Sequence, residues 1–208
     1  MILTLPVNNG WITTNCYFFG NDAGRGFLID PGAEGDQILA ALKEKRLVAE
    51  QILITHGHCD HIGAAAFLAE ALAAPILLRD AGKPYAENPY WNLSALSGDA
   101  LRLENVTYFS GGARLALDSD PSFGLQAIAS PGHTADGTVF YSKEDGLAFT
   151  GDTIFAGGPG RTDLPGGDDQ TLLASIRRLF EVLPDGTVLY PGHGAPTRAQ
   201  TEKPLYCF

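Results

Sequence analysis

The chain has 208 residues, of which 45% are apolar and 18% charged, a balance typical of a folded globular protein and unlike that of a disordered one. Its 24 acidic residues outnumber 14 basic ones, and the formal net charge of −10 argues against nucleic acid or an anionic membrane as a partner. The length suits one well-filled core, so we predict a single domain over residues 1–208.

The N-terminal segment lacks the features of a targeting sequence. Residues 1–6 contain no basic side chain, and Asn8 and Asn9 interrupt the apolar run that a signal peptide would need. The longest alanine-rich stretch, residues 62–74, contains Glu70 and is too short to cross a bilayer. We therefore expect a cytoplasmic protein that binds no membrane.

The three cysteines are Cys16, Cys59 and Cys207. An odd number with wide spacing is typical of free thiols in a reducing compartment and does not suggest a disulfide framework. Cys59 lies between candidate metal ligands, but its side chain would point away from neighbours that converge on one ion. A role in packing, or in supporting a ligand, is the favoured interpretation.

Apolar runs predict a series of short elements in the first third of the chain. They are, in chain order, strands at residues 2–5, 16–19 and 26–29, a helix at about residues 36–45, and a strand at residues 51–55. The alanine-rich helix follows, and Pro75 ends it before a short strand at residues 76–78.

The last third is predicted to repeat this order. Strands are expected at residues 138–141 and 146–150, followed by a glycine-rich loop, a helix and a strand at residues 188–190. The helix begins after Asp168, and its apolar side chains fall on one stripe with helical spacing, which indicates one buried face. These side chains are Leu172, Leu173, Ile176, Leu179, Phe180 and Leu183.

The two thirds share an outline of strand, glycine-containing loop, helix and strand. In each, the first strand is followed by an aspartate, Asp30 or Asp152, and the second strand leads to a Gly-His pair. The 25 glycines and 13 prolines favour short elements joined by many turns. We infer a sheet-rich α/β protein with a pseudo-duplicated βαβ layout, in which polar residues gather at one edge of two sheets.

All five histidines lie in three glycine-containing segments at predicted strand ends. The segments are Thr55-His56-Gly57-His58-Cys59-Asp60-His61, Pro131-Gly132-His133 and Pro191-Gly192-His193. A single Pro-Gly-His carries little information, because an isolated histidine is more often an ordinary polar residue. The pattern His-x-His-x-Asp-His is different, because imidazole and carboxylate are the ligands that borderline-soft divalent metals prefer.

Four candidate ligands within six residues can converge only where the chain turns sharply. The predicted strand ends just before His56, so His56 and His58 fall on the turn, and Asp60 and His61 open a helix expected to begin near residue 62. Asp60 would also suit the N-cap of that helix, but a cap does not explain three neighbouring histidines. We therefore predict a metal site.

The distant segments add His133, Asp152 and His193, and seven donors are more than one tetrahedral site needs. They suggest two divalent metal ions, zinc in the first place, with iron or a mixed iron–zinc pair as alternatives. One ion would rest on His56, His58 and His133 and the other on Asp60, His61 and His193, with Asp152 as the bridge. Two ions about 3.5–4 Å apart can share a water, lower its pKa and polarise a substrate carbonyl. Hydrolysis is the expected chemistry, with Asp60 and Asp152 as the catalytic carboxylates.

On these residues the chain resembles the metallo-β-lactamase superfamily. The resemblance extends from Asn15-Cys16-Tyr17 and Ile29-Asp30-Pro31-Gly32 to Pro191-Gly192-His193-Gly194. It implies a four-layer αββα sandwich with the metal site in the cleft at the edge of two sheets. Within the superfamily, Gly151-Asp152-Thr153-Ile154-Phe155 followed by Gly160-Arg161-Thr162-Asp163 looks like the branch that contains glyoxalase II and the persulfide dioxygenases.

The sequence differs from typical glyoxalase II at two points. That enzyme continues into a helical domain with basic groups for glutathione, whereas 15 residues follow His193 here. The glyoxalase pattern also has Lys and Tyr in the glycine loop and a Tyr after the last histidine, where this sequence has Arg161, Asp163 and Ala195. Asp152 separates the chain from true β-lactamases, which generally lack a carboxylate at that point.

Three further features each have two interpretations. Asp30 either is a turn residue or, as we favour, orients a metal ligand through a hydrogen bond. Arg161 either pairs with Asp163 and holds its loop or binds a substrate carboxylate. Residues 85–93, with two tyrosines and a tryptophan, form either a lid or a local packing cluster, the second being the commoner case.

The favoured function is hydrolysis of a small-molecule thioester by a metal-bound hydroxide at the two-metal centre, as in glyoxalase II-like hydrolases of hydroxyacyl thioesters. The alternative is a persulfide dioxygenase-like oxidation at one iron held by His58, His133 and Asp152. Hydrolysis of a lactone or another ester is less favoured. A catalytically silent metal-binding module conflicts with the complete set of ligands.

Overall fold

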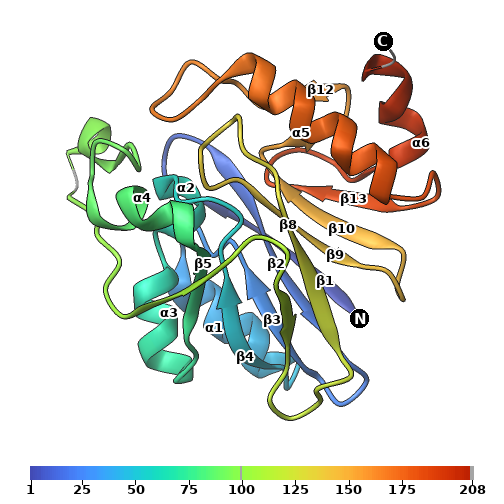
Figure 1. Ribbon diagram of the computed structural model, residues 1–208. Helices are drawn as coiled ribbons and strands as arrows, with labels where there is room; N and C mark the ends of the chain where they lie inside the picture. Colours follow the sequence, from blue (N-terminus) through green and yellow to red (C-terminus); the bar gives the residue numbers. More distant parts are fainter. Residues whose placement is uncertain (99, 207–208) are drawn as a thin grey trace.

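The computed structural model describes residues 1–98 and 100–206 and contains two six-stranded sheets that pack face to face (Figure 1). The first sheet has the order β1-β2-β3-β4-β5-β6. Its strands are β1 (Ile2–Asn8), β2 (Thr13–Gly20), β3 (Arg25–Ile29), β4 (Val48–Leu53), β5 (Ile76–Arg79) and β6 (Val106–Phe109). The first three strands are antiparallel, whereas β3 to β6 are parallel.

The second sheet has the order β14-β13-β10-β9-β8-β7. Its strands are β7 (Arg114–Ala116), β8 (Gly124–Ala129), β9 (Thr138–Ser142), β10 (Leu147–Gly151), β13 (Val188–Pro191) and β14 (Thr197–Arg198). β10 and β13 are parallel, and the other neighbours are antiparallel. A separate small ribbon pairs β11 (Ile154–Phe155) with β12 (Gly158–Pro159).

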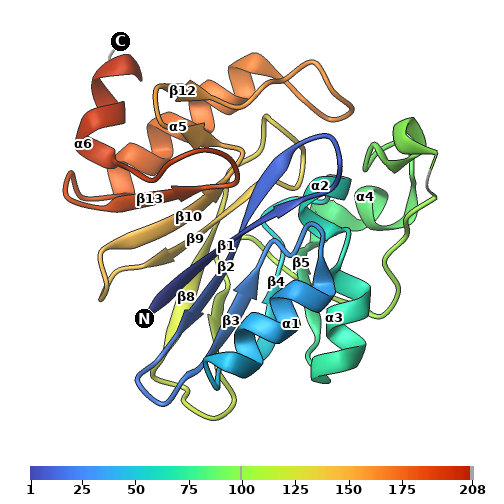
Figure 2. The same ribbon diagram turned by 180° about the vertical axis from the view of Figure 1, so that it is seen from behind.

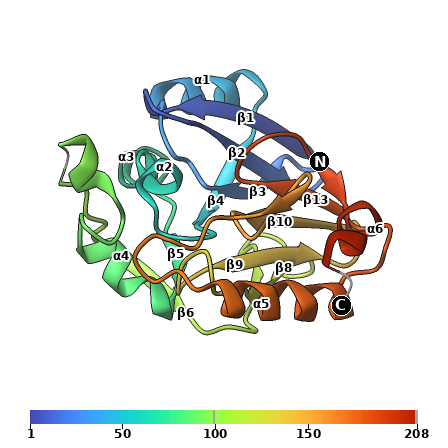
Figure 3. The same cartoon turned by 90° about the horizontal axis from the view of Figure 1, so that it is seen from above.

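Helices cover the outer faces of both sheets. Figure 2 shows α1 (Gly35–Glu44) and α3 (Ala65–Leu72) in front of the first sheet, and α5 (Asp169–Val182) lies on the second. The shorter helices are α2 (Cys59–Ile62), η1 (Asp80–Gly82), α4 (Lys83–Glu87), η2 (Ser94–Ser97), α6 (Ala199–Glu202) and η3 (Lys203–Tyr206). Seen from above, the layers run helices, sheet, sheet, helix (Figure 3), so the predicted αββα sandwich is confirmed.

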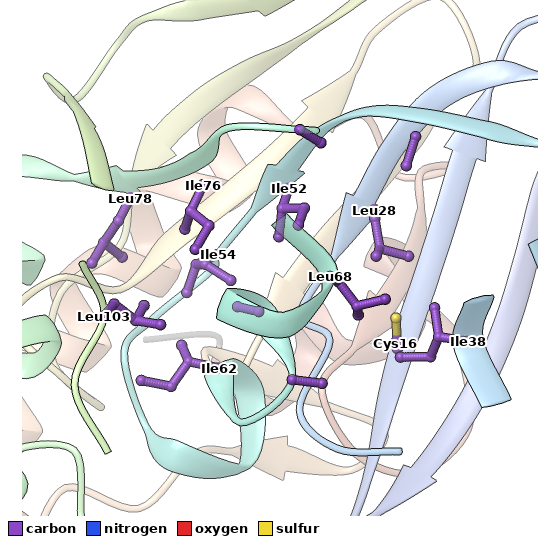
Figure 4. Close-up of a cluster of buried hydrophobic side chains, with 14 of the residues drawn as sticks. Cys16, Leu28, Ile38, Ile52, Ile54, Ile62, Leu68, Ile76, Leu78 and Leu103 are labelled. Atoms are coloured by element: carbon purple, nitrogen blue, oxygen red, sulfur yellow. The ribbon is translucent and has the colours of Figure 1, made fainter. Parts of the chain in front are cut away.

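Three apolar clusters hold the layers together. The first joins α1 and α3 to the first sheet and includes Leu28 and Leu68 (Figure 4). The second fills the space between the sheets, with Phe27 from one and Phe149 from the other, and the third packs Ile176 of α5 on the second sheet. Neighbouring residues of β3, Phe27 and Leu28, thus serve different clusters. Because both faces of the first sheet are covered at β3 and β5, the buried stretches of these strands, Phe27–Ile29 and Ile76–Leu78, are continuously apolar and do not alternate.

The alanine-rich segment forms two helices where the sequence predicted one. The predicted start of this helix near residue 62 is wrong, because α2 starts at Cys59 and α3 starts at Ala65. The break lies at Gly63, which packs on the preceding loop: a Cβ there would lie 2.3 Å from the carbonyl oxygen of Gly32. The single turn α2 is therefore placed independently of α3.

Two parallel βαβ units, β3-α1-β4 and β10-α5-β13, occupy corresponding places in the two sheets. The residues that follow their strands meet at one end of the sandwich, where His61 lies 3.0 Å from Asp30 and 3.4 Å from Asp152. The repeated outline seen in the sequence is confirmed, and it places the polar loops of both sheets together.

Both cysteines in the described part of the chain are free thiols, Cys16 buried and Cys59 half-buried. The same prediction for Cys207 lies outside the described residues. Among residues 1–98 and 100–206, the longest and most apolar helices still fall short of what a membrane crossing requires.

Candidate metal centre

Four of the predicted ligands come from the segment that follows β4. They are His56 and His58, on the turn after that strand, and Asp60 and His61, in α2. A buried carboxylate fixes the turn: the backbone N–H of Gly57 donates to Asp136, with 2.9 Å between the nitrogen and Oδ2. The first sheet thus delivers two ligands on a loop and two on a helical turn.

Asp60 does not cap this helix, which was the alternative interpretation of its position. The N-cap residue of α2 is His58, and no side chain there bonds to the backbone. The Asp60 carboxylate instead lies 3.3 Å from Nε2 of His193 and accepts a hydrogen bond from the Thr14 hydroxyl. It therefore faces the other candidate ligands.

The remaining three ligands come from the second sheet. His133 lies between β8 and β9, Asp152 follows β10, and His193 follows β13. The last of these loops is held by the Asn15 side chain on β2, which donates to the carbonyl groups of Pro191 and Gly194. The candidate centre is a seam between the two sheets.

Three imidazole nitrogens converge at one point of this seam. Nδ1 of His58 lies 3.1 Å from Nε2 of His56 and 3.0 Å from Nε2 of His133. Two nitrogens bound to one tetrahedral metal ion at about 2.0–2.1 Å are about 3.3 Å apart, so the spacing suits a single ion. Burial lowers the pKa of His56 well below its usual range and that of His58 to about 3, so both rings are neutral and carry a free lone pair.

A second group of donors consists of Asp60, His61 and His193. Oδ2 of Asp60 lies 3.5 Å from Nε2 of His61 and 3.3 Å from Nε2 of His193. Asp152 lies between the groups: its Oδ2 is 3.3 Å from Nε2 of His193 and 3.6 Å from Nε2 of His133. One carboxylate therefore contacts both sets of ligands.

Hydrogen bonds from the far side of the rings set the direction of four histidines. Their Nδ1 atoms face protein oxygens: His56 the Thr55 hydroxyl, His61 the Asp30 carboxylate, His133 the Arg161 carbonyl and His193 the Thr13 carbonyl, at 2.6–3.2 Å. An Nδ1–H that donates outward leaves Nε2 unprotonated and aims it into the cluster. His58 is the exception, because its Nδ1 points inward.

Two donor atoms inside the cluster, Nε2 of His61 and Oδ1 of Asp152, are buried and have no hydrogen-bond partner in the described chain. Buried polar atoms are nearly always paired, so their position fits a bound cation. Burial raises the pKa of the Asp152 carboxyl, but His61 and a hydrogen bond from His193 outweigh it and hold that pKa well below its usual range. Burial lowers the pKa of His61 and His193, but the neighbouring carboxylates outweigh it and raise that of His61 well above its usual range and that of His193 to about 10, so both rings release a proton when a cation binds. Ionised carboxylates together with the imidazole nitrogens freed in this way are the donor chemistry of a divalent metal.

Asp30 is buried behind His61. Its Oδ2 accepts from Nδ1 of His61 at 3.0 Å and from the Thr55 hydroxyl at 2.6 Å, and its Oδ1 accepts from the Thr55 backbone N–H. Because the Thr55 hydroxyl donates to Asp30, it is left as an acceptor for Nδ1 of His56. Asp30 thus contacts His61 directly and His56 through Thr55.

Arg161 is placed by two contacts of different kinds. Its guanidinium forms a bidentate ion pair with Asp163, at 2.6 and 2.7 Å, and both side chains are exposed. Its carbonyl oxygen accepts from Nδ1 of His133 at 2.6 Å. The ion pair is the structural alternative expected from the sequence, whereas the carbonyl contact was not expected.

The aromatic residues of segment 85–93 pack locally. Tyr85 is buried, its ring lies 5.3 Å from that of Trp91, and its hydroxyl donates to the carbonyl of Pro165. Tyr85 also lies beside the cluster, with its ring 6.0 Å from that of His58. Leu93, residues of η2 and Cys59 line the cavity that opens next to the cluster, and the backbone N–H of Cys59 donates to the carbonyl of Asn92.

Sequence reasoning missed the residues that hold the ligands in place: Thr13, Thr55, Asp136 and the backbone of Arg161. Two of them act through carbonyl oxygens, which any residue type supplies, so no motif reveals them. Asp136, three residues after His133, carries the one visible sign, a carboxylate close to a ligand segment.

A cavity of about 950 Å³ opens above the cluster. Its floor includes His58, Asp60, His133, Asp152 and His193, and its walls come from the turn between β1 and β2, the start of α1, α3 and η2. Ligand sites are typically cavities of about 300–1,000 Å³ that combine apolar walls with a few polar groups, so a small molecule would reach the donors from this side.

Comparison with known proteins agrees with the geometry. The family model described as the metallo-beta-lactamase superfamily matches residues 9–193. The probable metallo-hydrolase YqgX of Bacillus subtilis is 36% identical over 202 residues, covering 96% of this chain and 92% of that protein. The hydroxyacylglutathione hydrolase GloC of Haemophilus influenzae is 34% identical over 198 residues, covering 91% and 89%.

Solved structures show the same architecture. The crystal structure of BLEG-1, a B3 metallo-beta-lactamase, superposes with a TM-score of 0.90 at 31% identity and covers 98% of this chain and 97% of that one. The structure of TTHA1623 in a di-iron-bound form superposes with a TM-score of 0.84 at 37% identity and covers 96% of each chain. Both neighbours share the architecture over nearly the whole of this chain, and one of them was solved with two iron ions bound.

Proposed function

The chain belongs to the metallo-β-lactamase superfamily, and from that premise we propose that it hydrolyses small-molecule thioesters at a pair of divalent metal ions. The observation that carries this proposal is the place of Asp152. Its carboxylate contacts His133 of one donor group and His193 of the other, which is the position of a bridging ligand. A carboxylate in this position can bind two ions at once and hold them close enough to share a substrate or a water.

We assign one ion to His56, His58 and His133, and the other to Asp60, His61 and His193. A metal pair held by these residues would lower the pKa of a shared water and polarise the substrate carbonyl. Asp60 and Asp152 line the open side of the cluster and would orient the water by accepting its hydrogens. The proposal needs no side-chain nucleophile.

Zinc is the proposed metal, with iron or a mixed pair as the alternative. Three imidazoles with a carboxylate suit zinc, and the same nitrogen and oxygen donors also suit iron. The relative TTHA1623 was crystallised with two iron ions at 37% identity, which supports a two-metal centre and keeps iron as a candidate. Thioesters are proposed because GloC, at 34% identity, is named for hydrolysis of one.

The second candidate function is oxidation of a persulfide at a single iron on His58, His133 and Asp152. These side chains lie close together, with His133 3.0 Å from His58 and 3.6 Å from Asp152. The hydrolase is favoured because the donors of Asp60, His61 and His193 converge as a further group, which a mononuclear centre would leave without use.

Replacing His193 tests the two-metal mechanism. In the hydrolase, His193→Ala should remove about one metal per chain and lower kcat by well over tenfold, because one half of the metal pair is lost. Metal content and turnover of a simple thioester would be measured on the same preparation. Arg198→Ala, an exposed change five residues further along, serves as the control.

The mononuclear alternative has the opposite consequence. There the iron rests on other residues, so His193→Ala would keep its iron and most of its oxygen uptake with a persulfide. If the variant retained both the wild-type metal content and more than about a tenth of the thioesterase rate, a loss smaller than roughly 1.4 kcal/mol, the two-metal mechanism would be wrong.

A further inference from the structure

The cavity above the metal centre has an apolar rim that the proposed chemistry does not require. Trp11 and Ile12 on the β1–β2 turn, Phe67 on α3 and Leu96 on η2 are all exposed, and all four line this cavity. Trp11 and Leu96 are 75% and 70% exposed. Large apolar side chains that gather around a site while solvated mark a surface that an apolar ligand covers.

The rim is built into the fold and is not a chance grouping. The ring of Phe67 lies directly over Gly35 at the start of α1, where a Cβ would approach it to 2.4 Å. The carboxylate of Glu34 accepts from the backbone N–H of Asn8, at the end of β1, and thereby ties the β1–β2 turn to α1. The turn that carries Trp11 is anchored beside Phe67, and both line the same cavity as η2.

Apart from one paired arginine, the charges around the cavity are negative. Among the described residues, and apart from the candidate metal ligands, the ionisable side chains that line it are Cys59, Glu34, Asp36 and Arg161. The guanidinium of Arg161 is engaged by the carboxylate of Asp163 in a bidentate ion pair. The described cavity lining therefore offers two carboxylates and no unpaired cation to the part of a substrate that extends away from the metals.

We infer that this site selects thioesters that carry an apolar group of several carbons and no negative charge on the thiol portion, with a neutral or cationic thiol preferred. The inference rests on the proposed thioesterase function and names its substrate class. The apolar rim covers the hydrocarbon, and Glu34 and Asp36 disfavour an anionic carrier such as glutathione, for which relatives such as GloC are named.

The test compares thioesters of one acyl group whose thiol portions differ in charge. Hexanoyl esters of thiocholine, N-acetylcysteamine and 3-mercaptopropionate carry a cationic, a neutral and an anionic thiol portion. At low ionic strength the metal-loaded protein should show kcat/KM for the anionic ester about tenfold below that for the neutral one, and salt should narrow the gap. Hexanoyl-N-acetylcysteamine should exceed acetyl-N-acetylcysteamine by at least about tenfold.

Variants locate the effect on the rim. Trp11→Ala with Leu96→Ala should remove most of the preference for hexanoyl over acetyl, because both side chains are exposed and lie on the cavity rim that covers the longer chain. Asp36→Lys should raise kcat/KM for the anionic ester relative to the cationic one. Val182→Ala, an exposed apolar residue of α5 outside the cavity, is the matched control.

A binding measurement separates this inference from the thioesterase proposal. S-hexyl thioethers of the same three thiols cannot be hydrolysed, and Trp11 fluorescence in a Trp91→Phe background reports their binding, because these are the two tryptophans of the chain. Binding in the order cationic or neutral above anionic, without turnover of any thioester, would support the inference and overturn the thioesterase. Turnover with equal or better use of the anionic ester or of S-D-lactoylglutathione, or with selectivity unchanged in the double variant, would overturn the inference and leave the thioesterase standing.

Discussion

A single carboxylate, that of Asp30, reaches histidines of both donor groups. It accepts from His61 directly, and through the Thr55 hydroxyl it fixes His56. Its backbone φ of 51° is left-handed, a conformation that aspartate and asparagine tolerate better than other non-glycine residues. Asparagine at this position would therefore keep the backbone conformation and change only the carboxylate to an amide.

Asp30→Asn should weaken metal binding about 10- to 100-fold, because an amide cannot accept from the His61 ring and the Thr55 hydroxyl through the same oxygens as a carboxylate. Competition with a chelator of known affinity would measure the change. Asp22→Asn, exposed in the turn between β2 and β3, removes an equal charge and should have no effect. Equal metal affinity in the two variants would show that Asp30 is only a turn residue and does not orient the metal ligands.

Asp136 is a buried carboxylate whose effect on the free energy of unfolding should depend on pH. Burial raises its pKa to about 6, although the hydrogen bond from the backbone N–H of Gly57 and the charge of Arg79 act in the opposite direction. A raised pKa means that the folded protein binds the proton more tightly than the unfolded chain, for which the reference value is 3.8. The contribution of this group to the free energy of unfolding is therefore fully present below about pH 4 and is lost as the pH rises through 6.

Asp136→Asn removes this pH dependence and keeps an oxygen that can accept the hydrogen bond from the backbone N–H of Gly57. Between pH 5 and pH 8 the free energy of unfolding of wild type should fall, relative to the variant, by on the order of 1 kcal/mol. Urea unfolding of both metal-free proteins at the two pH values gives the difference. A constant difference between the two proteins across this range would mean that the carboxyl has an ordinary pKa in the fold.

At the residue scale, the sequence was informative where side-chain chemistry is distinctive. Histidine and aspartate at close spacing indicate a metal site, and the structure brings all seven predicted donors together. The supporting contacts could not be predicted, because the carbonyls of Thr13 and Arg161 are ordinary backbone groups. Their partners are distant in sequence and become neighbours only in the folded chain.

At the scale of elements, the break between α2 and α3 sets the position of two ligands, Asp60 and His61. Gly63 lies against the carbonyl oxygen of Gly32, and this contact lets α2 approach the loop behind Asp30. The sequence alone showed only an alanine-rich run with helical character. Contact between two backbones carries no periodic pattern, so the break was missed and the helix start was misplaced.

Gly63→Ala should therefore push α2 away from its loop and disturb Asp60 and His61. Overpacking of this kind costs about 1–3 kcal/mol, and metal at the second group should be lost first. Urea unfolding and metal analysis would record both effects. At Gly186 a Cβ would meet no atom within 4 Å, so Gly186→Ala is the control, and equal behaviour of the two variants would contradict the close contact.

The most deeply buried elements were predicted best. The stripe of α5 and the apolar runs of β3 and β10 are buried as expected, because burial leaves a stripe or a continuous apolar run in the sequence. The middle of the chain, with α4, η2, β6, β7 and β8, was not predicted. Its strands are only partly buried and its helices are about one turn long, so neither an apolar run nor a period marks them.

At the scale of the whole molecule, the donors of both sheets meet across one seam. His56, His58, Asp60 and His61 belong to the first sheet, whereas His133, Asp152 and His193 belong to the second. Metal ions bound there would join the two layers, in addition to the apolar cluster between them. Metal binding is then coupled to the association of the sheets.

Removing the metal with a chelator should abolish activity and lower the melting temperature. Metal at about 100 times its Kd stabilises the folded state by about 2.7 kcal/mol, which corresponds to roughly 6–10 °C for a chain of this size. Differential scanning calorimetry over a series of free metal concentrations would follow the shift, and re-addition should restore it. A melting temperature independent of metal would contradict ligands that span both sheets.

The outward hydrogen bonds of four imidazoles also give the site a spectroscopic identity. Once metal is bound through the inward nitrogens, His56, His61, His133 and His193 hold a proton on Nδ1, whereas His58, whose Nδ1 points inward, carries its proton on Nε2. In an NMR spectrum of the metal-loaded protein this means four rings of one tautomer and one of the other. The Nδ1 proton that the buried His61 donates to Asp30 should exchange slowly with solvent, and that of the partly exposed His193 should exchange faster. An intact centre could be recognised by this pattern of ring protons without any substrate.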